Sequence, residues 1–199
     1  MNKRTRRLLG DCLIALILAL GLAFVAYQVL NNQLPYRFAL FLIPLIWLGL
    51  RQGAPAAILT GALAVLGVGW FIGQEHQWLP LILRYLVPVM SLVLLGLFTK
   101  NTQKTLNNRR YSSVYLNIIT ASILVSVVYY LLAFLLASYL LQASNQFSLT
   151  SLNFWLSCLL TGLITGGILS IMARLWPKLI IPPHSRYLSR KETSSLLND

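Results

Sequence analysis

The stretch Tyr115–Leu141 reads YLNIITASILVSVVYYLLAFLLASYLL and contains no charged residue. An α-helix needs about 20 mainly apolar residues to cross a hydrocarbon core of roughly 30 Å, so this stretch predicts a transmembrane helix. Five other stretches are also mainly apolar: Leu8–Leu30, Phe38–Leu50, Pro55–Ile72, Leu79–Phe98 and Leu152–Leu175. The sequence therefore predicts an all-α integral membrane bundle of six transmembrane helices over residues 1–180, followed by a loose, basic and polar tail over residues 181–199.

Composition supports a membrane protein. The chain is 57% hydrophobic and only 10% charged, whereas a soluble domain has about 25% charged residues. Its net charge of +12 would suggest a nucleic-acid partner in a soluble protein. Here the basic residues lie in short runs between the apolar stretches, where they act as topology signals, so we expect lipid and no nucleic acid around the chain.

The second apolar stretch, Phe38–Leu50, is short for a full crossing. It is either a tilted partner of the third stretch, joined to it by the tight turn Arg51–Pro55, or a partly re-entrant segment. We favour the full crossing.

Lys and Arg residues predict the orientation, because they are enriched in cytoplasmic loops. With the N-terminus inside, 14 of the 16 Lys and Arg residues lie on the cytoplasmic side; the exceptions are Arg37 and Arg84. Both termini are therefore expected in the cytoplasm, in a bacterial cytoplasmic membrane. A cleaved signal peptide is the alternative for the basic N-terminus, but its apolar run is too long and no A-x-A site follows.

The inventory of reactive side chains argues against an enzyme. No catalytic set, metal site or phosphate-binding loop can be assembled from the acids, histidines and cysteines, so we expect no cofactor. Any active transport must take its energy from a partner, and a solitary proton-coupled carrier is disfavoured because no acid lies in mid-membrane. The acids, histidines and cysteines of the chain are Asp11, Glu75, Glu192, Asp199, His76, His184, Cys12 and Cys158.

Arg84 is the charged residue that points to a binding site. It lies about one and a half turns below the outer end of the fourth stretch, where an unpaired cation is costly. It either binds a ligand or extends its long side chain to the outer interface, toward Glu75 or His76.

Aromatic and polar residues gather at the same depth. They either contact a substrate, form an aromatic belt at the interface or bond between helices. The candidate substrate-binding residues are Trp70, Glu75, His76, Trp78, Arg84, Tyr85, Tyr129, Tyr130, Asn153, Trp155 and Thr161.

Two stretches carry small residues at helical spacing, which allows close approach between helices. In the sixth stretch, Gly162 and Gly166 predict packing within the bundle. In the first, Ala15, Ala19 and Ala23 form either a surface that docks another membrane protein or an internal contact.

Several short motifs, in the same order along nearly the whole chain, resemble a known family. They are Pro44 before Arg51-x-Gly53, the Gly/Ala-rich third stretch, Leu83-x-Tyr85-Leu86-Val87, Thr161-Gly162 and Trp176-Pro177-Lys178-Leu179-Ile180. The chain resembles the substrate-capture (S) components of energy-coupling factor (ECF) vitamin transporters, and among them the thiamine-specific members.

The resemblance implies a six-helix bundle that captures a vitamin from outside, between the outer loops and the fourth to sixth helices. It also implies docking onto a transmembrane coupling subunit driven by two cytoplasmic ATPases, with Ala15 and Ala19 resembling the docking stripe. Tyr85 matches a ligand-contacting tyrosine of the family.

The chain departs from the thiamine-specific pattern at the same site. Arg84 stands where the pattern has a glutamate, Thr161 where it has an asparagine, no tryptophan lies near Pro35 and Tyr36, and the fifth stretch has no histidine. A positive charge would repel a cationic ligand. The prediction is therefore an S component for thiamine or a related compound; an S component for an anionic metabolite and a non-transporting assembly or sensor protein are the alternatives.

Overall fold

The computed structural model describes residues 3–31, 37–73, 76–141, 149–183, 185 and 187–188. Within them every regular element is helical, as predicted. The elements are α1 (Lys3–Val25), η1 (Ala26–Leu30), α2 (Leu42–Gln52), α3 (Ala54–Gly67), η2 (Val68–Ile72), α4 (Trp78–Leu81), η3 (Ile82–Leu86), α5 (Val87–Val89), η4 (Met90–Leu94), α6 (Leu95–Asn107), α7 (Tyr111–Leu140), α8 (Leu152–Leu175) and α9 (Pro177–Ile180). The short elements from α4 to α6 form one helical run, Trp78–Asn107.

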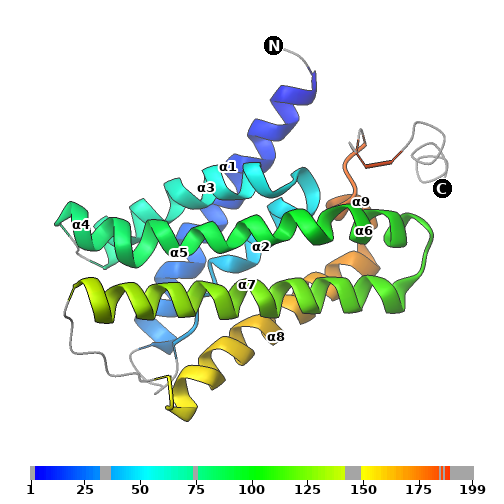
Figure 1. The fold of residues 1–199 in the computed structure, drawn as a ribbon. Coiled ribbons are helices and arrows are strands. Elements are labelled where there is room, and N and C mark those ends of the chain that lie inside the picture. Colours follow the sequence, from blue (N-terminus) through cyan, green and yellow to red (C-terminus); the bar gives the residue numbers. More distant parts are fainter. Residues whose placement is uncertain are drawn as a thin grey trace.

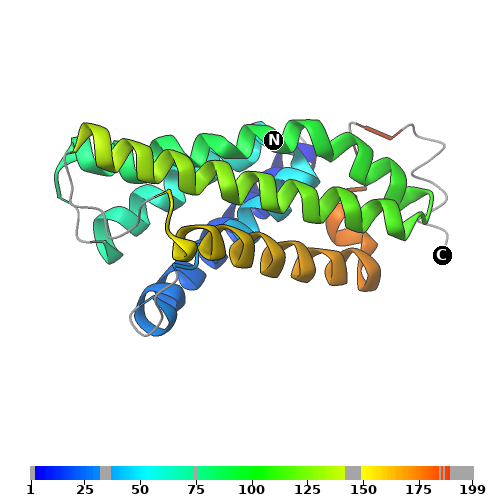
Figure 2. The ribbon, with the colours of Figure 1, turned by 60° about the horizontal axis from the view of Figure 1, so that its bottom comes forward.

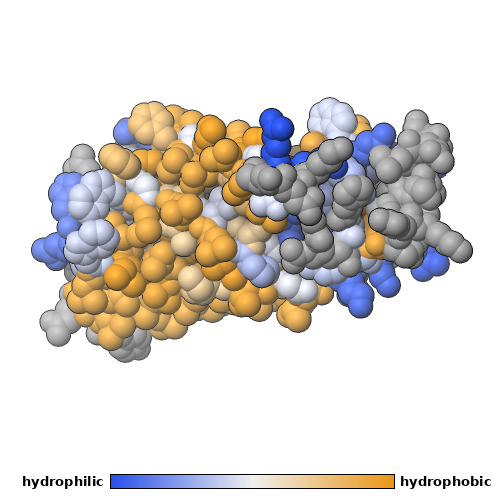
Figure 3. Space-filling view, turned by 90° about the horizontal axis from the view of Figure 1, so that it is seen from above, coloured by the Kyte–Doolittle hydropathy of each residue, from blue (hydrophilic) through white to orange (hydrophobic). Residues whose placement is uncertain are grey.

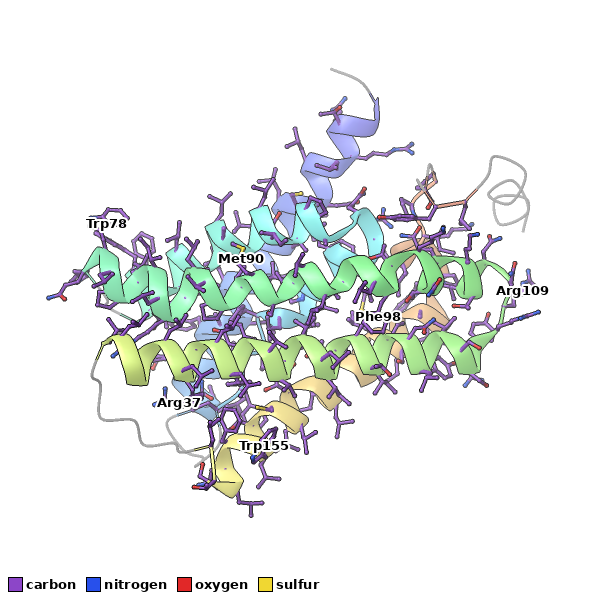
Figure 4. All side chains as sticks on the ribbon, in the orientation of Figure 1. Arg37, Trp78, Met90, Phe98, Arg109 and Trp155 are labelled. Carbon is purple, nitrogen blue, oxygen red and sulfur yellow. The ribbon has the colours of Figure 1, made fainter. Side chains whose placement is uncertain are left out.

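The helices form an elongated bundle (Figure 1). The α4–α6 run and α7 lie side by side along its length, with α3 on one side of the pair and α8 on the other, and α1 crosses obliquely (Figures 1 and 2). We call the end with α4 and Trp78 the aromatic end, and the end with Arg109 and α9 the basic end (Figure 4).

Five helical segments of the described chain are long and apolar enough to cross a membrane: Thr5–Leu30, Ala54–Ile72, Trp78–Asn107, Tyr111–Leu136 and Leu152–Leu175. They match five of the six predicted stretches. One face of the molecule is apolar over most of its length, with hydrophilic residues toward the two ends (Figure 3). That pattern suits a protein surrounded by lipid tails.

The second stretch differs from the prediction. Helix α2 has 11 residues, which span about 16 Å, or half of a hydrocarbon core. Residues 37–41 before it are not helical, and Gly53 ends it with φ of 103°. The helix alone is therefore too short for the full crossing that we favoured. It lies inside the bundle, with eight of its residues buried.

The alanine stripe of α1 is an internal contact. Ala15 and Ala19 are fully buried and Ala23 is 5% exposed, on the side of α1 that packs against α2 and α3. Their small side chains let the helices approach closely. In this conformation the stripe is covered by the chain's own helices, and its role in docking a partner stays a prediction. The opposite side of α1, with Leu13 and Ile17, is exposed.

The glycines of α8 form the internal contact that was predicted. A Cβ added to Gly162 would lie 2.8 Å from Cα of Ile123, and one added to Gly166 would lie 3.0 Å from Cα of Ile119. Helix α8 therefore packs directly on the backbone of α7.

A polar cluster, the Arg51 hub, ties α1, α2 and α9 together at the basic end. Arg51 Nε donates to Asp11 Oδ2 at 2.7 Å, and its Nη1 donates to the carbonyls of Lys178 and Leu179 at 2.7 and 2.8 Å. Trp47 Nε1 donates to the same Leu179 carbonyl at 3.0 Å. The hub thus holds three segments that are distant in sequence.

The segment after α9 packs on the bundle. Ile181 and Leu188 are 5% and 8% exposed, and Ser185 Oγ donates to Gln103 Oε1 of α6. The described residues of this segment therefore contact the bundle through two apolar side chains and one hydrogen bond to a buried amide, whereas the loose tail from residue 181 stays a prediction. Residues 189–199 lie outside the described part of the chain.

Candidate substrate-binding site

The aromatic end contains two π-helical turns, η2 and η3, which carry Trp70 and the pair Arg84–Tyr85. A π turn holds one more residue than an α turn and so rotates the side chains that follow. Such turns are frequent at functional sites. Their presence makes the region between η2, η3 and α7 the first candidate for a binding site.

Tyr85 lies in a slot formed by two glycines of the third span. A Cβ on Gly69 would lie 3.1 Å from Cδ2 of Tyr85, and a Cβ on Gly73 would overlap the Tyr85 hydroxyl. The ring is partly buried against the core, and η3, which carries it, packs on α7. Tyr85 therefore stands between η2 and α7.

The buried part of the site is a network around Tyr130. Its hydroxyl donates to the Arg37 carbonyl at 2.5 Å and shares a hydrogen bond with Thr161 Oγ1 at 3.2 Å. The Arg37 N–H donates to Ser157 Oγ at 3.0 Å. Tyr130 is 4% exposed and Thr161 is fully buried. For these two residues we predicted either contact with a substrate or a bond between helices, and the structure shows a hydrogen bond between the helices α7 and α8.

Tyr129 connects this network to the entry of α2. Its ring meets Tyr130 at 5.5 Å and Phe41 at 5.6 Å, both edge to face, which is a favoured geometry for aromatic pairs. Tyr129 is 7% exposed. Tyr129, Tyr130 and Thr161 are thus connected, and Tyr85 lies on η3, which packs on the helix of the two tyrosines; we call these four residues the tyrosine group.

Trp70, His76 and Trp78 form a second cluster at the surface of the aromatic end. Trp70 meets His76 at 5.4 Å and Trp78 at 5.8 Å. All three are exposed, Trp78 to 68%. An interfacial belt requires this exposure, and a cap over the tyrosine group is also compatible with it.

Trp155 and Asn153 lie apart from Trp78, at the start of α8 (Figure 4). Trp155 Nε1 donates to the Leu149 carbonyl at 3.0 Å, and its ring meets Phe154 at 5.2 Å. Asn153 is exposed. The structure therefore divides the predicted set into the tyrosine group, an outer cluster and a separate start of α8.

Arg84 is half-buried in η3 and engages another group of the chain. It precedes Tyr85 directly in the chain, and neighbouring helical residues point in different directions. Glu75, its predicted neighbour, lies outside the described residues.

Sequence reasoning missed Phe41, Ser157 and the backbone of Arg37, which complete the buried network. Nothing in their local sequence marks them, because their partners are 88 to 120 residues away. The glycine pair Gly69 and Gly73 carried a signal, since their spacing places both on one side of a helix. Among the described residues no group of three His, Cys, Asp or Glu could hold a metal ion.

Comparison with known proteins identifies the family. The family described as thiamine transporter protein (Thia_YuaJ) matches residues 12–181. The chain belongs to this thiamine transporter family. Its members are substrate-binding components of transporters and not enzymes, as the resemblance implied.

A solved structure has a fold similar to that of this chain. ThiT from Listeria monocytogenes is 23% identical, covers 91% of this chain and 100% of its own, and superposes with a TM-score of 0.75. At that identity the likeness shows a shared fold. No curated protein matches the chain.

Proposed function

We propose that the chain is the membrane-embedded substrate-capture component of an ECF-type importer for thiamine or a related compound, and that it binds this compound at the tyrosine group. The observation that carries the proposal is family membership over residues 12–181, combined with Tyr85 packed between η2 and α7. Aromatic walls suit a ligand built of flat heterocyclic rings, because stacked or edge-to-face rings attract each other.

The proposed topology is six crossings with both termini in the cytoplasm of a bacterial cell and the aromatic end outside. Residues 37–41 and α2 together make the short second crossing. Irregular backbone is tolerated at membrane depth only inside protein, and Ala39 and Phe41 are buried. The N–H groups of Arg37 and Phe38 are bonded to Ser157 and Asn31 side chains. Arg109 at the basic end fits a cytoplasmic loop.

The proposed partners are a transmembrane coupling subunit and two cytoplasmic ATPases, since the sequence has no phosphate-binding loop of its own. Co-purification from native membranes tests this. Recovery of ATPase subunits supports a transporter component, whereas a chain that binds no ligand and recovers no ATPase is a non-transporting assembly or sensor protein.

The ligand is tested by titrating the purified protein with thiamine and following the fluorescence of Trp70, Trp78 and Trp155. We expect saturable quenching that is weakened about tenfold or more in Tyr85→Ala, because an aromatic contact and its buried area are lost. Leu97→Ala, a change at a 70% exposed residue distant from the site, is the matched control.

Arg84 supports one alternative, an anionic ligand. A guanidinium binds carboxylate or phosphate through charge-assisted hydrogen bonds and repels a cation. If the ligand is anionic, wild-type protein ignores thiamine and binds a phosphorylated or carboxylated analogue, and Arg84→Glu reverses the preference. Unchanged binding of thiamine in Arg84→Ala would exclude a role for Arg84 at the site.

A further inference from the structure

Gly69 and Gly73 are separated by one helical turn, and both face the ring of Tyr85. The contact distances divide along the ring. An added Cβ at Gly69 would meet the ring carbons Cδ2, Cε2 and Cγ at 3.1, 3.3 and 3.4 Å. One at Gly73 would overlap the hydroxyl, and would lie 3.1 Å from the Gly69 carbonyl oxygen and 3.2 Å from Cζ of the ring. The two glycines therefore contact the tyrosine from its root to its tip.

Backbone conformation does not explain why these positions are glycine. Gly73 has φ of −77°, which any residue adopts, and among the described glycines only Gly53 has a positive φ. The two glycines also do not face open space, where any side chain would fit, because an alanine Cβ at either position would contact Tyr85. What requires glycine here is the space that the Tyr85 ring occupies.

The slot also determines where the ring can go. Tyr85 has two rotatable side-chain bonds and a rigid ring, so a clash at its hydroxyl tilts the whole ring. On its other side η3 packs on α7, where the ring of Tyr129 is held by Phe41 and Tyr130. A Cβ in the slot would therefore push the Tyr85 ring away from η2 and change its position relative to the other members of the tyrosine group.

We propose that Gly69 and Gly73 are positioning residues, which set the orientation of Tyr85 so that its ring forms a wall of the substrate site. This inference rests on the proposed function, because it gives the slot a role in binding. It predicts that alanine at either glycine weakens ligand binding without touching the ligand.

A double-mutant cycle with Tyr85→Phe tests the slot. Gly73→Ala should lower the melting temperature by roughly 2–10 °C, because overpacking is destabilising. Tyr85→Phe removes the overlapping hydroxyl, so the double variant should recover most of that loss. Gly69→Ala meets ring carbons, which phenylalanine retains, so Tyr85→Phe should not rescue it. Gly96→Ala, whose Cβ would meet nothing nearer than 3.9 Å, is the control and should not lower the melting temperature.

Thiamine binding is the second readout. Gly73→Ala should raise the Kd by about three- to tenfold, the range expected from a misplaced aromatic contact. The double variant should bind thiamine as tightly as Tyr85→Phe alone. If Gly73→Ala does not fold, recovery of folded protein on adding Tyr85→Phe is itself the rescue.

Two results separate the inference from the proposed function. Additive melting temperatures for Gly73→Ala and Tyr85→Phe would overturn the slot, whatever the ligand. A folded wild-type protein that does not bind thiamine would overturn the proposed ligand, while the melting temperatures would still decide whether the glycines set the ring. Unchanged thiamine affinity in a destabilised Gly73→Ala would also overturn the positioning role.

Discussion

The Arg51–Asp11 ion pair should be among the strongest single contributions to stability at the basic end. The two side chains are 12% and 13% exposed, so little water replaces a lost partner. Arg51 also donates to the carbonyls of Lys178 and Leu179, and Gln52 Nε2 donates to Asp11 Oδ2 at 2.5 Å. Removing either charge leaves the other with incomplete bonding in a region of low dielectric constant.

The magnitude follows from the exposure of the pair. Breaking a buried pair costs about 3–5 kcal/mol, and an exposed pair is worth about 0–1 kcal/mol. For a pair that is about seven-eighths buried we expect about 2–4 kcal/mol for Asp11→Ala and somewhat more for Arg51→Met, which also leaves two carbonyls without their donor. For a chain of this length that is a melting-temperature decrease of about 4–16 °C.

The assay is thermal unfolding of purified protein in detergent, followed by tryptophan fluorescence, for both single variants and the double variant. The loss of unfolding free energy in the double variant Asp11→Ala/Arg51→Met should be smaller than the sum of the two single losses by about 1–3 kcal/mol, because neither charge is left without its partner. Arg174→Gln, at an exposed position near the same end, is the control and should stay within about 0.5 kcal/mol. Strict additivity, or a loss in Arg174→Gln as large as in Asp11→Ala, would refute the reasoning.

Two further predictions concern the network and the C-terminal segment. Tyr130→Phe removes the hydrogen bonds to the Arg37 carbonyl and Thr161 and should destabilise the protein by about 1–3 kcal/mol. Tyr27→Phe, at a residue that is 44% exposed, is the control and should change little. Equal effects of the two variants in thermal unfolding would contradict the role of the network. A chain that ends after Ile180 loses two buried aliphatic side chains and should be less stable than one that ends after Leu188 by about 3 kcal/mol or more. Equal thermal unfolding of the two truncated chains would show that the segment between them does not contribute.

Hydropathy alone predicted the long helices well. The stretch Leu152–Leu175 has the same limits in the sequence and in the structure, and Tyr115–Leu141 differs from α7 by a few residues at its start. Such stretches are long, apolar and bounded by polar residues, so local sequence is sufficient to place them.

Hydropathy could not show whether a partner or another helix of the same chain covers a given residue. Ala15 and Ala19 form a smooth stripe whether a partner or the chain's own helices lie against it, and only the packing of α2 and α3 decides. The candidate site was limited in the same way. The sequence placed Trp78 and Trp155 at helix ends on the same predicted side, but it could not show that the two lie apart in the bundle (Figure 4).

Helix α2 shows how a half-length helix is held inside the bundle. Where water is excluded each unbonded backbone group costs several kcal/mol, so both ends of such a helix must be bonded by protein. At its start, the N–H groups of Leu42 and Ile43 donate to the carbonyls of Ala39 and Leu40, and Pro44 has no N–H to bond. The first turn is therefore bonded by the residues that precede it.

The end of α2 is bonded by its own C-cap and by a side chain of α6. The Gly53 N–H donates to the Gly49 carbonyl at 2.9 Å, and Gln103 Nε2 of α6 donates to the carbonyls of Leu50 and Arg51 at 2.7 and 3.0 Å. Gln103 is fully buried, where an unbonded amide would be costly. A short apolar stretch thus becomes an internal helix because a polar residue about 50 positions later in the chain satisfies its end, which no local pattern in Phe38–Leu50 records.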